Sequence, residues 1–294
     1  MVNKNLTAVA KDWSKGHSIP VGFIPETIIP IYDKPIIDRI DSAEATRDAI
    51  VYRIGKQGNL INHEYKHDYC NSVSANCSFG TLECLLGNIN YAKLINESLS
   101  KVISFSPEGL ICTNPTNSID LSSNSIYGIF EFLVGNTIKA KEHLGLIKLN
   151  FSSTDGLRWE SIKNSSLNLY SNSLLGILEY LVGSEPESSI IKDSLFRKIA
   201  KPNPALSSML LGESQNDSIL STHSNAAFGI LNYLLDNREY TDAIITDIVS
   251  LFPMEHGLLG HGIENYRLFT NSNSVFATLL VAERLVHKSL NKKY

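Results

Sequence analysis

The chain has 294 residues, of which 43% are hydrophobic and 19% are charged, and its formal net charge is −4 at pH 7. This length and hydrophobic content are sufficient for a large core, in one domain or two. The weak negative charge argues against a nucleic-acid-binding protein, and the sequence has no run of 18 apolar residues that would predict a membrane span.

The first 40 residues are interrupted by Pro20, Pro25, Pro30 and Pro35 and lack the continuous apolar stretch of a secretory signal. We therefore expect residues 1–40 to form an extended arm that packs on a single domain of residues 41–294. We also expect a cytoplasmic protein, in which Cys70, Cys77, Cys84 and Cys112 are structural thiols rather than disulfides. The oligomeric state is left open.

One helix-like segment occurs five times without gaps, beginning with SANCSFGTLECLLGN at Ser74 and SSNSIYGIFEFLVGN at Ser122. The third residue of every copy is asparagine: Asn76, Asn124, Asn172, Asn225 and Asn273. The differences between these positions are 48, 48, 53 and 48 residues, which indicates a repeat protein. Apolar residues cover nearly all sides of each copy, so we predict buried inner helices near residues 74–87, 122–135, 170–183, 223–236 and 271–288.

Three local features of these segments have a physical explanation. The Ser and Asn at their start predict N-caps, because a short polar side chain can accept a hydrogen bond from a free N–H at the start of a helix. Glycine or alanine at the seventh position predicts close approach of a neighbouring helix. Glycines at the end, such as Gly87, predict helix C-caps.

A second set of helices, amphipathic and more charged, is predicted near residues 41–54, 91–103, 137–149, 188–200 and 240–252. The connections alternate between a few residues and about 20 residues, whereas an ordinary helical solenoid has short turns on both sides. We therefore predict an all-α fold, an α/α toroid of about five helical-hairpin repeats with inner helices ringed by outer ones. An open superhelix is the alternative.

An acidic-Gly turn stands ahead of several inner helices, as in Glu108-Gly109-Leu110, Asp155-Gly156-Leu157 and Glu255-His256-Gly257-Leu258. This pattern resembles the α/α-toroid repeats of terpenoid cyclases, of protein prenyltransferase β subunits and of (α/α)-barrel sugar enzymes. The last turn is also similar to the His-Gly-x-x-Gly turn of lanthionine cyclases. The resemblance implies a fold and no catalytic residues, because the Asp-x-Asp-Asp and Gln-Trp motifs are absent and residue 255 is Glu where a Cys-His pair is needed.

In a toroid the N-termini of all inner helices meet at one end of the ring, together with the long loops. Five helix N-termini create a positive potential there, so we expect a small-molecule substrate that carries negative charge or electron-rich oxygens. The five repeated asparagines lie at the same end, and they either hold the helices in place or bind ligand. His223 and Trp159 are further candidate ligand-binding residues.

Ionisable residues in the long loops are candidates for acid–base catalysis. If the ring closes, the last loop, with Glu255, His256 and His261, approaches the first, with His63, His67 and Asp68. Asp155 offers a carboxylate near Trp159, a combination that suits a sugar ring. The candidate catalytic residues are His63, His67, Asp68, Asp155, Glu255 and His256.

These observations favour an enzyme without an organic cofactor that acts on a small polar molecule in the central cavity, with lyase, cyclase or isomerase chemistry ahead of hydrolysis. No metal site is assigned. A zinc-dependent transferase or cyclase that uses the Asp68 and Cys70 region is one alternative, and a non-catalytic binding module or partner platform is another.

Overall fold

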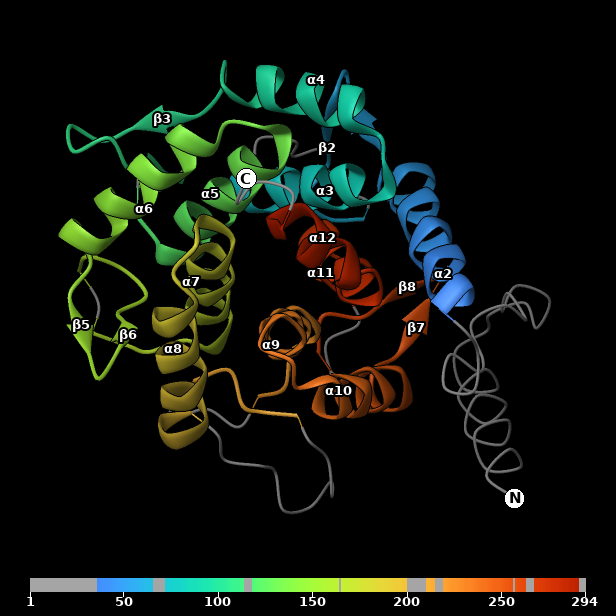
Figure 1. Cartoon of the computed structure of the whole chain (residues 1–294). Coiled ribbons are helices and arrows are strands. Elements are labelled where there is room, and N and C mark those ends of the chain that lie inside the picture. Colours follow the sequence, from blue (N-terminus) through green and yellow to red (C-terminus); the bar gives the residue numbers. More distant parts are fainter. Residues whose placement is uncertain are drawn as a thin grey trace.

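The computed structural model describes residues 36–65, 72–113, 118–163, 165–199, 210–214, 219–255, 257–262 and 267–290. Five inner helices stand around a common axis, as Figure 1 shows. They are α3 (Val73–Leu86), α5 (Leu121–Val134), α7 (Leu169–Val182), α9 (Thr222–Leu234) and α11 (Thr270–Leu280). The predicted closed α/α toroid is confirmed, because α11 packs against α3 and the circle has no gap.

The outer helices follow the inner ones after short turns. They are α4 (Ile89–Leu99), α6 (Thr137–Asn150), α8 (Glu185–Lys198) and α10 (Arg238–Leu251). The helix α2 (Ile36–Ala49), continued by the π-helical turn η2 (Ile50–Ile54), packs mainly against α11, so the first outer helix partners the last inner helix. An ion pair of 2.9 Å between Arg39 on α2 and Asp242 on α10 lies across the same junction.

Each described long connection carries a short antiparallel hairpin, which the sequence patterns did not predict. The hairpins are β1–β2 (Lys56–Gln57 and Leu60–Ile61), β3–β4 (Ser104–Phe105 and Ile111–Cys112), β5–β6 (Ser153–Thr154 and Leu157–Arg158) and β7–β8 (Met254–Glu255 and Leu258–Leu259). Strands of two residues are too short to show the alternation of polar and apolar side chains by which a strand is recognised.

Two predicted boundaries are wrong. Residues 36–40 are helical rather than extended, because no proline follows Pro35 in this stretch. Residues 1–35 of the predicted arm lie outside the described part. The predicted inner helix of residues 271–288 is two helices, α11 and α12 (Glu283–Leu290). The turn between them directs α12 towards the ring axis, where Leu285 is buried.

The predicted caps are also displaced. The N-cap residues are Ser72, Asp120, Asn168 and Ser221, each four residues ahead of the repeated asparagine, and each side chain accepts a hydrogen bond from a first-turn N–H. A cap must be extended while the next residue is helical, as in Asp120 with φ −112° and ψ 150°. The repeated asparagines already lie within the helices, so they are not the N-cap residues.

The expected close approach of helices at the repeated glycine is confirmed. A Cβ atom on Gly80 would lie 2.4 Å from the Phe130 ring, and one on Gly128 would lie 2.7 Å from Leu178. The expected C-caps at Gly87, Gly135 and Gly183 also adopt left-handed conformations. The inner helices therefore touch at their glycines, which makes the ring narrow.

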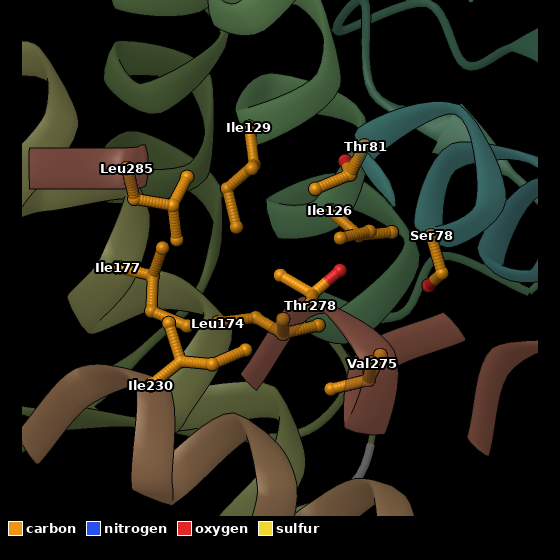
Figure 2. A pocket seen from close by; sticks show the side chains of 10 residues that line it. All are labelled: Ser78, Thr81, Ile126, Ile129, Leu174, Ile177, Ile230, Val275, Thr278 and Leu285. Carbon is orange, nitrogen blue, oxygen red and sulfur yellow. The ribbon is translucent and has the colours of Figure 1, made fainter. Parts of the chain in front are cut away.

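The centre of this narrow ring is packed rather than open. Between the inner helices the cavity measures about 20 Å³ and is lined mainly by aliphatic side chains, among them Ile126, Leu174 and Ile230, with Leu285 of α12 (Figure 2). Substrate pockets usually have several hundred Å³. The expectation of a substrate in a central cavity is therefore wrong for the described residues, and any site must lie at an end of the ring.

Candidate functional site

The five repeated asparagines fasten the preceding connection of their own repeat to the inner helix. Each Oδ1 accepts a hydrogen bond from a backbone N–H of that connection, at 2.7–2.8 Å, and each Nδ2 donates to the carbonyl of the same residue. The partners, in chain order, are Ile61, Ile111, Arg158, Leu211 and Leu259. The second N–H of each Nδ2 donates to the backbone carbonyl four residues earlier.

Both donors of every amide are thus used within the chain, and all five side chains are fully buried. The sequence left two roles open for the repeated asparagines, to hold the helices in place or to bind ligand. The hydrogen bonds support the first role for Asn76, Asn124, Asn172, Asn225 and Asn273. The ligand-binding role that we expected for them has no free donor to support it.

After the hairpin, each connection reaches across to the previous inner helix. The residues at equivalent places are His63, Thr113, Glu160, Glu213 and His261. The carbonyls of His63 and His261 accept hydrogen bonds, each of 2.9 Å, from the first N–H groups of α11 and α9, and those of Glu160 and Glu213 bind α5 and α7 in the same way. The first N–H of α5, α7, α9 and α11 is therefore engaged by a backbone carbonyl. The expected preference for an anionic ligand is not supported by these contacts.

These bonds place the side chains of the connections beside the first turns of the inner helices. We call this end of the ring the mouth. His63, Tyr170, Glu213, His223 and His261 gather there, and we call them the mouth cluster. Tyr170 and His223 occupy the same repeat position, two residues ahead of the repeated asparagine, whereas His63, Glu213 and His261 come from the connections.

Ring contacts link most of the mouth cluster into an arc. The rings of Tyr170 and His223 meet edge to face at 4.3 Å, and those of His223 and His261 stack at 4.7 Å with 19° between their planes. The ring of Phe269 lies 5.0 Å from His261 and 5.1 Å from His63. Four residues of the cluster therefore form a continuous wall with Phe269.

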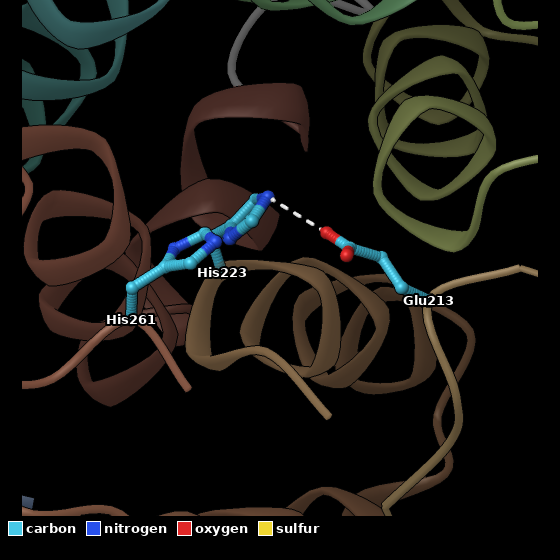
Figure 3. A group of neighbouring side chains, drawn as sticks. All are labelled: Glu213, His223 and His261. Carbon is cyan, nitrogen blue, oxygen red and sulfur yellow. Dashed lines mark ion pairs between the residues drawn. The ribbon is translucent and has the colours of Figure 1, made fainter. Parts of the chain in front are cut away.

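Glu213 closes one side of this wall, as Figure 3 shows. Its Oε1 lies 3.6 Å from Nε2 of His223. The same oxygen accepts hydrogen bonds of 3.3 Å from the hydroxyls of Ser221 and Ser224 at the start of α9. On the other imidazole, Nδ1 of His261 lies 3.0 Å from the Ser272 hydroxyl. Neighbouring hydroxyls thus hold the carboxylate and the second imidazole in fixed orientations.

Burial determines the protonation state of the imidazoles. It lowers the pKa of His63, of His223 and of His261, because a charged ring loses hydration there. His223 is only 7% exposed, and its Nδ1 is buried without a hydrogen-bond partner, as is Nδ1 of His63. At neutral pH the three rings are neutral, so each has a nitrogen that can accept a proton or bind a cation.

The sequence-predicted site residues have different positions. His63 and His223 belong to the mouth cluster, and His63 approaches His261 across the closing seam, as expected. His67, Asp68, Cys70 and His256 lie outside the described residues.

Three other candidates do not join the mouth cluster. Asp155 is at the tip of hairpin β5–β6, where its side chain pairs with Lys198 and its carbonyl accepts from Ser194, both on α8. Glu255 is the last residue of strand β7, in the corresponding hairpin β7–β8 of the last repeat. Trp159 packs half-buried against the core. The hairpin tips point towards outer helices, so the predicted role of Asp155 and Glu255 at the mouth is wrong for the described structure.

Sequence reasoning did not name Tyr170 or Glu213, and it named His261 as a last-loop histidine at the closing seam without including it among the candidate catalytic residues. Tyr170 and His223 share one repeat position with Ser74, Ser122 and Asn271, so a comparison of the copies shows where the side chain is large and polar. Glu213 and His261 are harder to find, because the distance from the connection residue to the repeated asparagine varies between 11 and 13 residues, as in Thr113 to Asn124 and His63 to Asn76.

Among the helices that the structure describes, none has both the length and the apolar character of a membrane span. The sequence matches no protein-family model and no curated protein.

Solved structures with a similar fold include three enzymes or enzyme relatives. D-mannose isomerase has a TM-score of 0.56 and 9% identity over 88% of this chain and 99% of that chain. A possible member of the GH105 family from Salmonella enterica subsp. enterica serovar Paratyphi A has a TM-score of 0.55 and 12% identity over 90% and 98%. The alpha-1,6-mannanase GH76A from Salegentibacter sp. HEL1_6 has a TM-score of 0.53 and 14% identity over 84% and 99%.

An inactive variant of that mannanase was solved in complex with alpha-1,6-mannotriose. At these identities the similarities show a common fold. The chain therefore shares the α/α-toroid architecture of these proteins and carries its own group of ionisable residues at the inner-helix N-termini.

Proposed function

We propose that the protein is an enzyme of the hydrolase or isomerase kind that acts on a small hydroxylated molecule, a sugar before others, at the mouth of the ring. The observation that carries the proposal is the mouth cluster itself. It combines buried imidazole nitrogens that have no hydrogen-bond partner among the described residues with a carboxylate and aromatic rings. Buried polar atoms are nearly always satisfied, so unpartnered ones in one cluster fit a group that accepts a ligand.

The composition of the cluster favours a sugar. Aromatic faces such as Phe269 and Tyr170 provide apolar surface against the C–H side of a pyranose, and imidazole and carboxylate groups bind its hydroxyls. Three toroids of similar fold are named as a mannanase, a mannose isomerase and a possible member of a glycoside hydrolase family, which supports the same substrate class.

His63 is the residue that we assign to proton transfer. Its Nδ1 has no partner, its backbone is fixed by the N–H of Thr270, and its neutral ring can act as a base at neutral pH. For an isomerase, this base would remove a proton from the carbon next to the substrate carbonyl and return it to the former carbonyl carbon, while the hydroxyl proton moves from the neighbouring oxygen to the former carbonyl oxygen. For a hydrolase, it would take a proton from the attacking water while the glycosidic bond breaks and the leaving oxygen takes up a proton from solvent.

The experiment is a binding and turnover assay with a panel of monosaccharides and short oligosaccharides. Binding would be followed by saturation-transfer NMR for wild type, His63→Gln and Tyr170→Phe, with His287→Gln as the control at an exposed position of α12. Turnover in D₂O separates the two chemistries, because an isomerase incorporates deuterium at carbon and a hydrolase produces new reducing ends.

We expect His63→Gln to retain sugar binding and to lose at least about 100-fold in turnover, which is the usual contribution of a general base. A wild-type protein that binds no sugar in the panel would contradict the substrate class. Turnover unchanged by His63→Gln would contradict the assigned role of this residue. A binding module would show binding without turnover, which is the alternative that the sequence left open.

A further inference from the structure

We propose that Glu213, His223 and His261 form a binding site for a divalent transition-metal ion, zinc before others. One ligand atom from each residue, a carboxylate oxygen or an imidazole nitrogen, lies within 4.8 Å of the other two. The three residues come from two connections and the first turn of α9. The hydrogen bond from the Thr222 N–H to the His261 carbonyl brings the last connection to α9, so tertiary contact between neighbouring repeats builds the group.

The donor set fits zinc. Two neutral imidazoles and one carboxylate form the ligand set of many catalytic zinc sites. In a tetrahedral site with bonds of about 2.0–2.1 Å, ligand atoms are roughly 3.3 Å apart. The observed 3.6 Å between Oε1 of Glu213 and Nε2 of His223 is close to this separation. The Glu213 side chain is 24% exposed, so the group lies next to solvent from which an ion could enter.

An unpartnered buried nitrogen is a second, independent observation. The His223 side chain is buried, with only 7% of its surface exposed. Its Nδ1 has no hydrogen-bond partner among the described residues, and its Nε2 faces the Glu213 carboxylate. The ring is fixed between Tyr170 and His261. A buried imidazole with such surroundings lacks the hydrogen-bonded partner that a purely structural histidine would have. The ligand atom is Nε2, which faces the carboxylate, and coordination through Nε2 places the proton of the neutral ring on Nδ1.

The residues around the three ligands resemble the outer support of a metal site. Ser272 contacts Nδ1 of His261, which leaves Nε2 as the coordinating nitrogen. Ser221 and Ser224 donate to Oε1 of Glu213. Metal-binding histidines and carboxylates usually have such partners, which orient them and increase their affinity for the ion.

Among the residues that the structure describes, the group contains three ligands and no fourth. Three protein ligands leave one position of a tetrahedral ion for water or a substrate oxygen, as in catalytic rather than structural zinc sites. A bound zinc ion would polarise that oxygen. His63 is close to the group through Phe269 but does not belong to it, so its assigned proton-transfer role is compatible with a bound ion.

The proposed ion lies at the site of the proposed function, but the argument for it rests on ligand geometry and not on any substrate. The test can therefore be made without a substrate. The purified full chain would be stripped with a chelator, dialysed, and titrated with Zn²⁺ by calorimetry and with Co²⁺ by visible absorption. We expect one equivalent of metal, a tetrahedral Co²⁺ spectrum, and a melting temperature that rises with Zn²⁺.

Glu213→Gln, His223→Gln and His261→Gln should each weaken metal binding at least tenfold. Ser272→Ala should weaken binding by about 10–100-fold, which is typical of an outer-shell partner. The matched control is His63→Gln, which changes a neighbouring half-buried histidine outside the ligand set and should leave metal affinity unchanged. If a ligand variant fails to fold, the metal-dependent melting temperature of the wild type and the Co²⁺ spectrum still provide the test.

A stripped protein that binds no Zn²⁺ and no Co²⁺ would overturn the proposal. So would binding that survives all three ligand substitutions. Neither result would affect sugar binding by the wild type, and a failure to bind sugar would leave the metal titration intact, so the two proposals can fail separately.

Discussion

The side-chain amide of Asn172 pairs with the backbone of Arg158 as a neighbouring strand would. Oδ1 accepts from the Arg158 N–H at 2.7 Å, and Nδ2 donates to the Arg158 carbonyl at 2.9 Å and to the Asn168 carbonyl at 3.1 Å. One side chain thus fastens a hairpin to a helix, and the repeated asparagine makes the same hydrogen bonds to a backbone segment in all five repeats. The structure uses a buried amide where a longer sheet would supply backbone partners.

Replacing Asn172 with alanine should destabilise the protein by about 2–4 kcal/mol, because the N–H and carbonyl of Arg158 would lose a partner in a buried site. Chemical denaturation would measure the change. Asn150→Ala is the control, since that amide makes one bond to the Leu146 carbonyl within its own helix and is only half-buried. A loss below 1 kcal/mol for Asn172→Ala would show that water replaces the amide.

Gly80→Ala should destabilise the ring by about 1–3 kcal/mol, because the new Cβ would lie 2.4 Å from the Phe130 ring and force it to move. Gly145→Ala is the matched control. Gly145 lies within the outer helix α6 and has no atom within 4 Å of the added Cβ, so alanine should stabilise this helix by up to about 1 kcal/mol. Opposite signs in thermal melts would support this explanation, and equal signs would contradict it.

The fold was predictable because the chain repeats itself. Asn76, Asn124, Asn172, Asn225 and Asn273 mark the copies, and Gly80 and its equivalents mark the helix contacts. The helix α12 was missed because its apolar pattern continues that of α11 with no proline or glycine between them, and only packing at the ring axis explains the turn. The packed centre was missed for a similar reason. A helical period predicts buried faces, but not how far apart they stand.

The site was only partly predictable. His63 and His223 were named from residue type and place in the repeat, and they lie at the mouth. Glu213 and His261 depend on how two connections of different length cross to the preceding helix, through the bonds to the N–H groups of Leu169 and Thr222. Tertiary hydrogen bonds, rather than local pattern, place these side chains.

Glu131 is a fully buried carboxylate held by three donors, and its replacement by glutamine should destabilise the protein by about 3 kcal/mol. Its oxygens accept from Lys139 at 2.5 Å, from Asn136 at 2.5 Å and from Asn96 at 3.3 Å. Glutamine keeps the shape but places an N–H₂ group against donors and leaves Lys139 without its charge partner.

Burial raises the pKa of Glu131, but its hydrogen bonds to Lys139 and other donors outweigh this and keep the pKa below the usual value. Chemical denaturation at pH 7 would measure the loss, and Glu142→Gln on the exposed side of α6 should leave stability unchanged. Equal stability of Glu131→Gln and wild type would show that desolvation of the carboxylate cancels its pairing.

His143 should make the protein less stable in weak acid. Burial, together with nearby Lys139, lowers the pKa of His143 to about 4, whereas in the unfolded chain it is near the ordinary 6.5. The unfolded chain therefore takes up the proton first as the pH falls. Stability is complete above pH 6.5 and decreases as the pH falls towards the folded pKa, by about 2–3 kcal/mol at pH 4.5.

The free energy of unfolding at pH 7 and at pH 4.5 tests this expectation. His143→Gln should reduce the difference between the two values by about 2–3 kcal/mol. His287→Gln, at an exposed position, should leave the difference as in wild type. If His143→Gln loses as much unfolding free energy between pH 7 and pH 4.5 as wild type does, the acid sensitivity comes from other groups, such as the buried imidazoles at the mouth.

The helix α12 makes the two ends of the ring different. Leu285 is buried among the inner helices, and Nη1 of Arg284 donates to the Leu85 carbonyl near the C-terminus of α3, so this helix stands in the end of the ring opposite the mouth. The ring is consequently a cup rather than a tube. If the proposed function holds, substrate and product would have to use the same opening in turn, and a product that leaves slowly would block the next substrate.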